Sequence, residues 1–190
     1  MRSLQVGRWG LVLTALFVSF ASAQVEERVK ACAGCHGADG NSVIAGTPSL
    51  AGQPKVFLEN YLVLTREGLR GTDVMRQLLK GTSDREIIAL AAHYAKLTPR
   101  PDERPADKAL FGRGKAVAAK NRCGNCHLAD YRGREQMPRL AGQREDFLAE
   151  VMLAYQQNRR PGGDTIMAAS LYGIREADIK ALAHYLSRLR

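Results

Sequence analysis

The chain has 190 residues, 45% of them hydrophobic, and a formal net charge of +9. A chain of this length suits one medium-sized domain or two small ones. The positive charge alone would suit nucleic-acid binding, but the sequence contains no recognisable reader motif. We therefore expect no nucleic-acid partner.

Residues 1–23 have the pattern of a secretory signal peptide. Arg2 and Arg8 precede an apolar stretch, 11–20, and small residues end at Ala23, where a signal peptidase would cut. The apolar stretch is too short for the roughly 20 residues that a membrane-spanning helix needs. The sequence therefore predicts export to the periplasm with cleavage after Ala23. An uncleaved N-terminal anchor is the alternative, and a later peripheral association with the membrane stays open.

The charge of the mature chain is unevenly distributed. Without Arg2 and Arg8, 26 basic and 19 acidic residues leave a formal charge of +7. Residues 24–97 contain nine basic and eight acidic side chains, whereas 107–190 contain fifteen and nine. The basic excess of the second half would orient docking to an acidic partner. A solvated basic surface is the equally good alternative.

A repeat with a period near 91 residues divides the chain. CAGCH at 32–36 recurs as CGNCH at 123–127, and PSLAGQ at 48–53 recurs as PRLAGQ at 138–143. Between the copies, 98–106 contains three prolines and no apolar periodicity, which indicates a non-helical linker. Self-similarity of this kind predicts two homologous domains. The expected divisions are domain 24–97, linker 98–106 and domain 107–190.

Helix signals dominate both copies, and strand signals are nearly absent. Amphipathic periodicity, acidic first turns and basic last turns occur at equivalent positions in the two copies. The expected helices are 25–34, 55–67 and 84–97 in the first copy and 107–122, 144–157 and 176–189 in the second. The expected fold class is all-α.

All four cysteines fall in two C-x-x-C-H motifs, and two small domains usually need a stabilising disulfide, metal or cofactor. Two thiols at this spacing can each form a thioether to a haem vinyl group, and the next residue then presents its imidazole to the iron. A structural disulfide, a thioredoxin-like redox pair and a zinc site are the alternatives. The duplicated histidine and the export signal favour two covalently bound haems c. The residues are Cys32, Cys35 and His36, and Cys123, Cys126 and His127.

Two methionines are candidates for the second axial position of each iron, where a thioether raises the reduction potential. Met75 and Met167 lie 39 and 40 residues after the histidine of their motif, whereas the other mature methionines have no counterpart in the repeat. His93 and His184 also repeat, within the last helix of each copy. They are the weaker candidates, because a helical histidine with an exposed polar edge is the simpler interpretation.

Repeated prolines and arginines suggest groups that surround the iron ligands. Pro48 and Pro138 follow their motif histidine by twelve and eleven residues, where a backbone carbonyl could accept the ring N–H and tune the iron. A simple turn of the chain is compatible with this role. Arg70 and Arg160 are candidate partners for haem propionates, with solvated surface arginines as an equally good alternative.

These motifs resemble those of the dihaem cytochromes c4, over essentially the whole mature chain. The resemblance rests on CAGCHGADGNS at 32–42, on the two P-x-L-A-G-Q hexapeptides, on CGNCH and on the two methionine-bearing segments. It implies two class I cytochrome c folds related by pseudo-twofold symmetry, haems close together, and His/Met ligation at both irons. The second copy departs from the family pattern, because Leu128 stands where a glycine usually follows the histidine.

The resemblance also implies a function. It suggests a periplasmic carrier that passes electrons from a respiratory donor, such as a bc1 complex, to a terminal oxidase, with redox proteins as partners and no small-molecule substrate. One alternative is the electron-accepting dihaem subunit of a dehydrogenase, as in flavocytochrome c sulfide dehydrogenases. Another is catalysis at a haem, as in a dihaem peroxidase or thiosulfate dehydrogenase, which needs an open coordination site. Because a methionine is available for each iron, we expect no catalytic residues and no enzyme activity.

Overall fold

The computed structural model describes residues 24–160, 162 and 164–190, so the predicted signal peptide, 1–23, lies outside them. Within this part of the chain, regular structure is helical apart from one isolated bridge between Arg134 and Met137. The expected all-α class is confirmed. Of the helices in these residues, none has both the length and the apolarity that crossing a bilayer demands.

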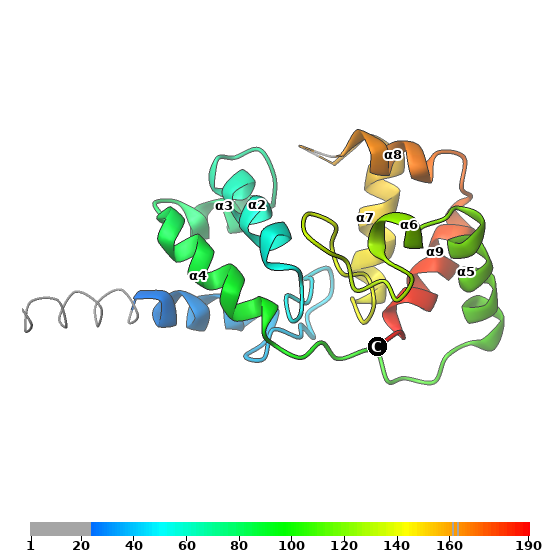
Figure 1. The fold of residues 1–190 in the computed structure, drawn as a ribbon, viewed down its shortest axis with the longest axis horizontal. Coiled ribbons are helices and arrows are strands. Elements are labelled where there is room, and N and C mark those ends of the chain that lie inside the picture. Colours follow the sequence, from blue (N-terminus) through cyan, green and yellow to red (C-terminus); the bar gives the residue numbers. More distant parts are fainter. Residues whose placement is uncertain (1–23, 161, 163) are drawn as a thin grey trace, which may run out of the picture.

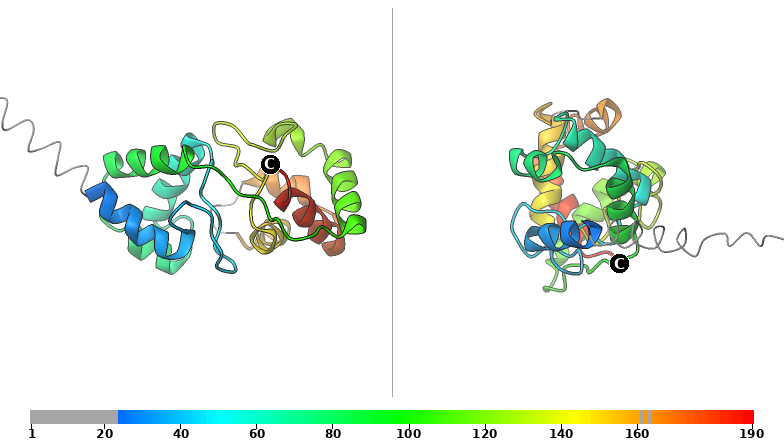
Figure 2. Two further views of the ribbon diagram at one scale, coloured as in Figure 1. Left: turned by 90° about the horizontal axis from the view of Figure 1, so that it is seen from below. Right: turned by 90° about the vertical axis from the view of Figure 1, so that its left-hand side faces the viewer.

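The molecule consists of two helical domains placed side by side, with the loops of each facing the other (Figure 1). Viewed along the long axis, one domain lies in front of the other (Figure 2). The first domain contains an N-terminal helix over 24–36, followed by α2 (Lys55–Arg66), α3 (Asp73–Leu79) and α4 (Asp84–Ala95). The second contains α5 (Lys108–Lys120), α6 (Gly124–His127), α7 (Glu145–Gln156), α8 (Thr165–Leu171) and α9 (Glu176–Ser187).

Side-chain caps begin several of these helices. Ser83 and Glu86 form a reciprocal capping box at α4, and the Asp107 carboxylate accepts two backbone N–H groups at the start of α5. The short helices α3 and α8 were not expected, because seven residues are too few to show amphipathic periodicity. Both matter for function, since they carry Met75 and Met167.

The second domain is organised around a close crossing of α5 and α9. A Cβ added at Gly114 would collide with the Ala181 carbonyl oxygen and lie 2.6 Å from the Tyr185 Cβ. Glycine therefore allows the two backbones to approach each other. The Tyr185 ring packs edge-on against Phe111 and Tyr131, with centroids 5.0 and 5.9 Å away.

The first domain joins its N-terminal helix to α4 differently. Val25 and Val29 pack against a small buried cluster that includes Leu90. Beside them, Arg28 Nε lies 2.6 Å from Glu86 Oε1 in a part-buried ion pair. Here an ion pair supplements the apolar packing between the two helices.

The repeated hexapeptides contribute two pairs of hydrogen bonds to the contact between the domains. The Ser49 N–H donates to Gln143 Oε1 at 2.8 Å, and Gln143 Nε2 donates to the Ser49 carbonyl at 2.8 Å. In the same way, the Arg139 N–H donates to Gln53 Oε1 at 3.0 Å, and Gln53 Nε2 donates to the Arg139 carbonyl at 2.9 Å. Because both pairs join equivalent positions of the repeat, this exchange is the pattern that a twofold axis produces.

Candidate haem-binding sites

Each C-x-x-C-H motif lies at the end of a helical segment. The first completes the helix over 24–36, and the second spans α6 and its N-cap, Cys123. In each motif the first cysteine is half-buried against the domain core, whereas the second, Cys35 or Cys126, is exposed. Each domain therefore presents one half-buried and one exposed thiol beside a histidine.

The environments of the thiols can be compared with what each of the three alternatives to haem requires. All four cysteines are free rather than paired in disulfides. Burial raises the pKa of the Cys32 and Cys123 thiols, whereas a reactive redox pair needs a lowered thiol pKa. Among the described residues, no three His, Cys, Asp or Glu side chains converge as the ligands of a zinc site would.

Both motif histidines are buried, with 5% and 6% of their surface exposed. His36 Nδ1 lies 2.8 Å from the Pro48 carbonyl oxygen, and His127 Nδ1 lies 2.9 Å from that of Pro138. Because a carbonyl oxygen only accepts, each Nδ1 must carry the ring proton, which leaves the Nε2 lone pair for a metal. Burial lowers the pKa of both rings more than the carbonyl bond raises it, so the neutral, iron-binding form is favoured.

The two candidate axial methionines occupy equivalent places, in the first turns of α3 and α8, and both are half-buried. The Thr72 hydroxyl accepts the Met75 N–H at 3.3 Å, and the Asp164 carboxylate accepts the Met167 N–H at 3.1 Å. These caps determine where each short helix begins. They therefore position the backbone that carries the thioether.

His184 does not have a free ring nitrogen. The Asp107 N–H donates to its Nε2 at 3.1 Å, and its Nδ1 lies 3.1 Å from Glu145 Oε1. The expectation of an exposed polar edge is wrong for this residue, because α9 is buried between α5 and α7 and only 5% of His184 is exposed. The His93 ring is half-buried edge-on to Tyr94, and its Nε2 has no hydrogen-bond partner among the described residues.

Arg70 and Arg160 meet at the domain boundary around one tyrosine. Their guanidinium carbons lie 5.8 and 6.0 Å from the centroid of the Tyr61 ring, and that of Arg160 lies 5.1 Å from the Tyr155 ring. Arg70 Nε donates to the Gly162 carbonyl at 2.7 Å, whereas the buried Arg160 Nε has no partner within the described residues. Neither arginine pairs with a described carboxylate. Both therefore have donors left for an anionic group.

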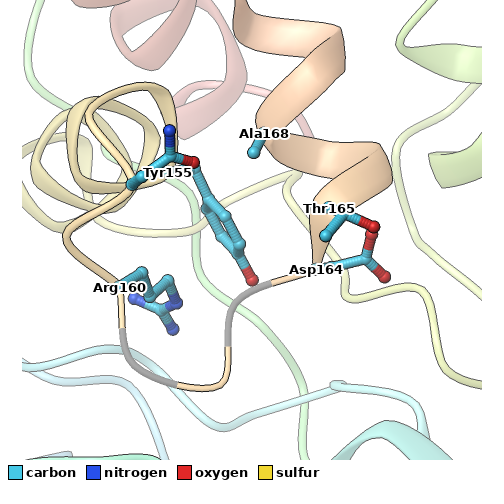
Figure 3. A pocket seen from close by; sticks show the side chains of 6 residues that line it. Tyr155, Arg160, Asp164, Thr165 and Ala168 are labelled. Carbon is cyan, nitrogen blue, oxygen red and sulfur yellow. The ribbon is translucent and has the colours of Figure 1, made fainter.

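A hollow of about 80 Å³ lies beside Arg160, between the end of α7 and the start of α8. Figure 3 shows Tyr155 and Arg160 opposite Asp164, Thr165 and Ala168. A space of this size admits a few water-sized groups.

The loop after each motif histidine has the same backbone in both domains. Gly37 and Gly40 have φ of 84° and 74°, and their counterparts Leu128 and Tyr131 have φ of 69° and 57°. In both loops the fourth residue after the histidine donates its N–H to the carbonyl of the first, at 3.0 Å. The departure from the family pattern therefore leaves the turn that leads to Pro138 unchanged.

Comparison with known proteins agrees with this geometry. A family model described as Cytochrome c matches residues 24–97 and 111–190. Cytochrome c4 of Pseudomonas aeruginosa is 30% identical, over 86% of this chain and 86% of that protein. The chain belongs to the cytochrome c family, among the dihaem cytochromes c4. The crystal structure of reduced cytochrome c4 from Pseudomonas stutzeri, 27% identical, matches with a TM-score of 0.80 over 90% of this chain and 98% of that one.

Membership of the cytochromes c4 confirms the expected cofactor, two covalently bound haems c, and a role in electron transfer. A second relative, the thiosulfate dehydrogenase electron acceptor of Thiomonas intermedia, is 30% identical over 98% of this chain and 90% of that protein. Sequence reasoning missed Gln53 and Gln143, although the repeat of the hexapeptide as far as its glutamine was the available signal.

Proposed function

We propose that the protein is a periplasmic electron carrier whose two haems are each held by one C-x-x-C-H motif and one methionine. The observation that carries the proposal is the fixed tautomer of the two buried motif histidines, each with Nδ1–H on a proline carbonyl. When bound, each haem supplies a one-electron couple between ferric and ferrous iron. The assigned thioether anchors are Cys32, Cys35, Cys123 and Cys126, and the assigned axial ligands are His36 with Met75 and His127 with Met167.

The residues of the chain anchor and orient rather than transform a substrate. The Pro48 and Pro138 carbonyls hold the imidazoles in one orientation, and the capped helices α3 and α8 present the methionines. With a histidine and a methionine both bound, each iron would have no open position for a substrate, and electrons would pass without bond formation. We assign no general acid or base and no catalytic residue.

We assign Arg70 and Arg160 to the haem propionates. Their guanidinium groups lie on the two sides of the domain boundary without a described carboxylate partner. A guanidinium fork suits a carboxylate, and pairing would offset the negative charge that two neighbouring haems bring to this boundary.

The proposed route runs from a respiratory donor, such as a bc1 complex, to a terminal oxidase. Export rests on the signal-peptide pattern of 1–23, which lies outside the described residues. The basic excess in 107–190 favours an acidic docking surface on one of the partners. Electron-transfer rates with that partner should fall steeply as salt is added.

Haem quantification and an optical redox titration of the periplasmic protein test the proposal. We expect two haems per chain, both low-spin, both showing the weak charge-transfer band of methionine-ligated ferric iron, and both with positive potentials. One high-spin haem, or one without that band, would instead indicate an open site and a catalytic cytochrome.

A second candidate is the electron acceptor of a dehydrogenase. It is favoured by the relative from Thiomonas intermedia, which matches 98% of this chain and is described as a thiosulfate dehydrogenase electron acceptor. Stopped-flow reduction distinguishes the two candidates. Fast reduction by a thiosulfate dehydrogenase with thiosulfate, and slow reduction by a bc1 complex with quinol, would favour the acceptor; the reverse would favour the carrier.

A further inference from the structure

One peptide unit connects His36 to the opposite domain. The carbonyl of the Pro48–Ser49 peptide accepts the His36 Nδ1–H at 2.8 Å. The N–H of that same peptide, on Ser49, donates to Gln143 Oε1 in the second domain, also at 2.8 Å. Gln143 is thus two hydrogen bonds and one peptide group away from the imidazole of the first motif.

The second motif repeats this connection in the opposite direction. The carbonyl of the Pro138–Arg139 peptide accepts the His127 Nδ1–H at 2.9 Å. The N–H of that peptide, on Arg139, donates to Gln53 Oε1 in the first domain at 3.0 Å. Each histidine is therefore linked to a glutamine of the other domain rather than of its own.

Burial limits the access of water to these bonds. Both histidines and both glutamines have only 5–6% of their surface exposed and Ser49 has 7%, whereas Arg139 is half-buried. Each glutamine is also held by a second bond, from its Nε2 to the carbonyl of the residue whose N–H it accepts. The amide therefore cannot rotate away without losing two bonds.

The two ends of a peptide group are coupled electronically. When the N–H of a peptide group donates a hydrogen bond, the group becomes more polarised and its carbonyl becomes a stronger acceptor. This effect is larger in a buried network. A stronger bond to Nδ1–H makes the imidazole more electron-rich and a better ligand for ferric iron, which lowers the reduction potential.

We infer that Gln143 tunes the potential of the haem in the first domain and that Gln53 tunes that of the haem in the second. Both are positioning residues that act through the Pro48–Ser49 and Pro138–Arg139 peptides. The inference rests on the proposed function for the assignment of His36 and His127 as axial ligands. Its consequence is that the contact between the domains helps to set both potentials.

Paired substitutions of the holoprotein test this crossed arrangement. In Gln143→Leu the Ser49 N–H loses its acceptor, so the first haem's midpoint potential should rise while the second haem's stays unchanged. In Gln53→Leu the second haem's potential should rise and the first haem's stay unchanged. Each variant is the control for the other. NMR signals of the axial methionine and haem methyl groups assign each potential to its domain.

Other patterns would overturn the inference. A shift of the haem in the glutamine's own domain would show a local effect, and equal shifts of both haems in both variants would show only a loosened interface. If neither variant changes the potential of either haem, the inference is wrong. Should either leucine variant fail to assemble, Gln143→Asn and Gln53→Asn apply the same test, because the shorter side chain cannot keep both bonds.

The wild-type protein separates this inference from the proposed function. If it lacks two low-spin haems with histidine ligation, the proposed function fails. If it has them and the paired variants do not give the crossed pattern, only the tuning by Gln53 and Gln143 fails.

Discussion

The first domain turns its chain after the motif histidine with Gly37 and Gly40, whereas the second makes the same turn with Leu128 and Tyr131. A side chain held at positive φ costs on the order of 1–3 kcal/mol. Tyr131 offsets part of this cost, because only 8% of the residue is exposed and its ring packs edge-on to Tyr185. Leu128, which is half-exposed, offsets less. The second domain therefore keeps the backbone conformation of this loop, although its residues disfavour a positive φ.

The loop is less strained in the first domain, but the contacts between helices are more extensive in the second. In the second domain the close crossing at Gly114 is supplemented by His184, whose two ring nitrogens join α9 to α7 and to the start of α5. In the first domain an ion pair between Arg28 and Glu86 joins the helices, and the Nε2 of the equivalent His93 has no described partner. We therefore expect the first domain to unfold before the second.

The largest expected effect is a change in the reduction potential of one haem at a time. Met75→His should lower the potential of the first haem only, and Met167→His that of the second only, because imidazole stabilises ferric iron better than a thioether does. We expect each shift to exceed about 120 mV, which is two tenfold steps for a one-electron couple. Spectroelectrochemical titration measures both potentials. An unchanged titration would show that the substituted methionine is not a ligand of the iron.

Next in size is the helix crossing of the second domain. Gly114→Ala should destabilise that domain by about 2 kcal/mol, because the new methyl group meets the backbone of α9, which cannot move aside cheaply. Gly112→Ala is the matched control on the same helix, since nothing lies within 4 Å of its added Cβ, and it should stabilise by about 0.5–1 kcal/mol. Denaturant unfolding followed by circular dichroism measures both; equal effects would contradict the close crossing.

A smaller effect should come from the loop that lacks its glycine. Leu128→Gly should stabilise the second domain by about 1 kcal/mol, because glycine adopts the φ of 69° and ψ of 161° found there without strain. The reciprocal change, Gly37→Leu, should destabilise the first domain, since its Cβ would collide with the Asn41 carbonyl oxygen. Thermal unfolding of both variants checks the pair. Destabilisation by Leu128→Gly would show that the side chain contributes more than its strain costs.

The smallest expected effect is a loss of stability of the first domain at acidic pH. Burial raises the pKa of the Glu86 carboxyl, but hydrogen bonds from Arg28 and Ser83 outweigh it and bring that pKa to about 2. A lowered pKa stabilises the fold above the ordinary value of 4.5, and that contribution is lost as pH falls toward 2. Because 29% of the Arg28 side chain is exposed and solvent screens the pair, we expect a loss of about 1 kcal/mol.

Unfolding measurements between pH 5 and pH 2 check this dependence, with Glu86→Gln as the comparison. The variant should be less stable near neutral pH and should lose less stability on acidification than the wild type. Equal pH profiles would show that the Arg28–Glu86 pair contributes nothing measurable.

Much of this molecule could be predicted from short patterns in the sequence. The cysteine–histidine motifs, the proline positions and the repeated methionines were identified because their spacing repeats across the chain. Five of the helix positions followed from periodicity and capping signals, and the helix over 24–36 extended two residues beyond its expected end. The helix positions depend on residues close together along the chain, and the other features were recognised by comparing the two copies of the repeat.

Contacts between distant residues were decided only by the tertiary structure. The crossed bonds of Gln53 and Gln143 join residues 86 and 94 positions apart, and the bond from Asp107 to His184 spans 77. The positive φ of Leu128 likewise opposes its local preference, because the loop must follow hydrogen bonds made to Tyr131 and His127. Local sequence thus determined which groups can bind and orient haem. The packing of one domain against the other determined which groups lie behind each histidine, since that depends on how two distant surfaces fit.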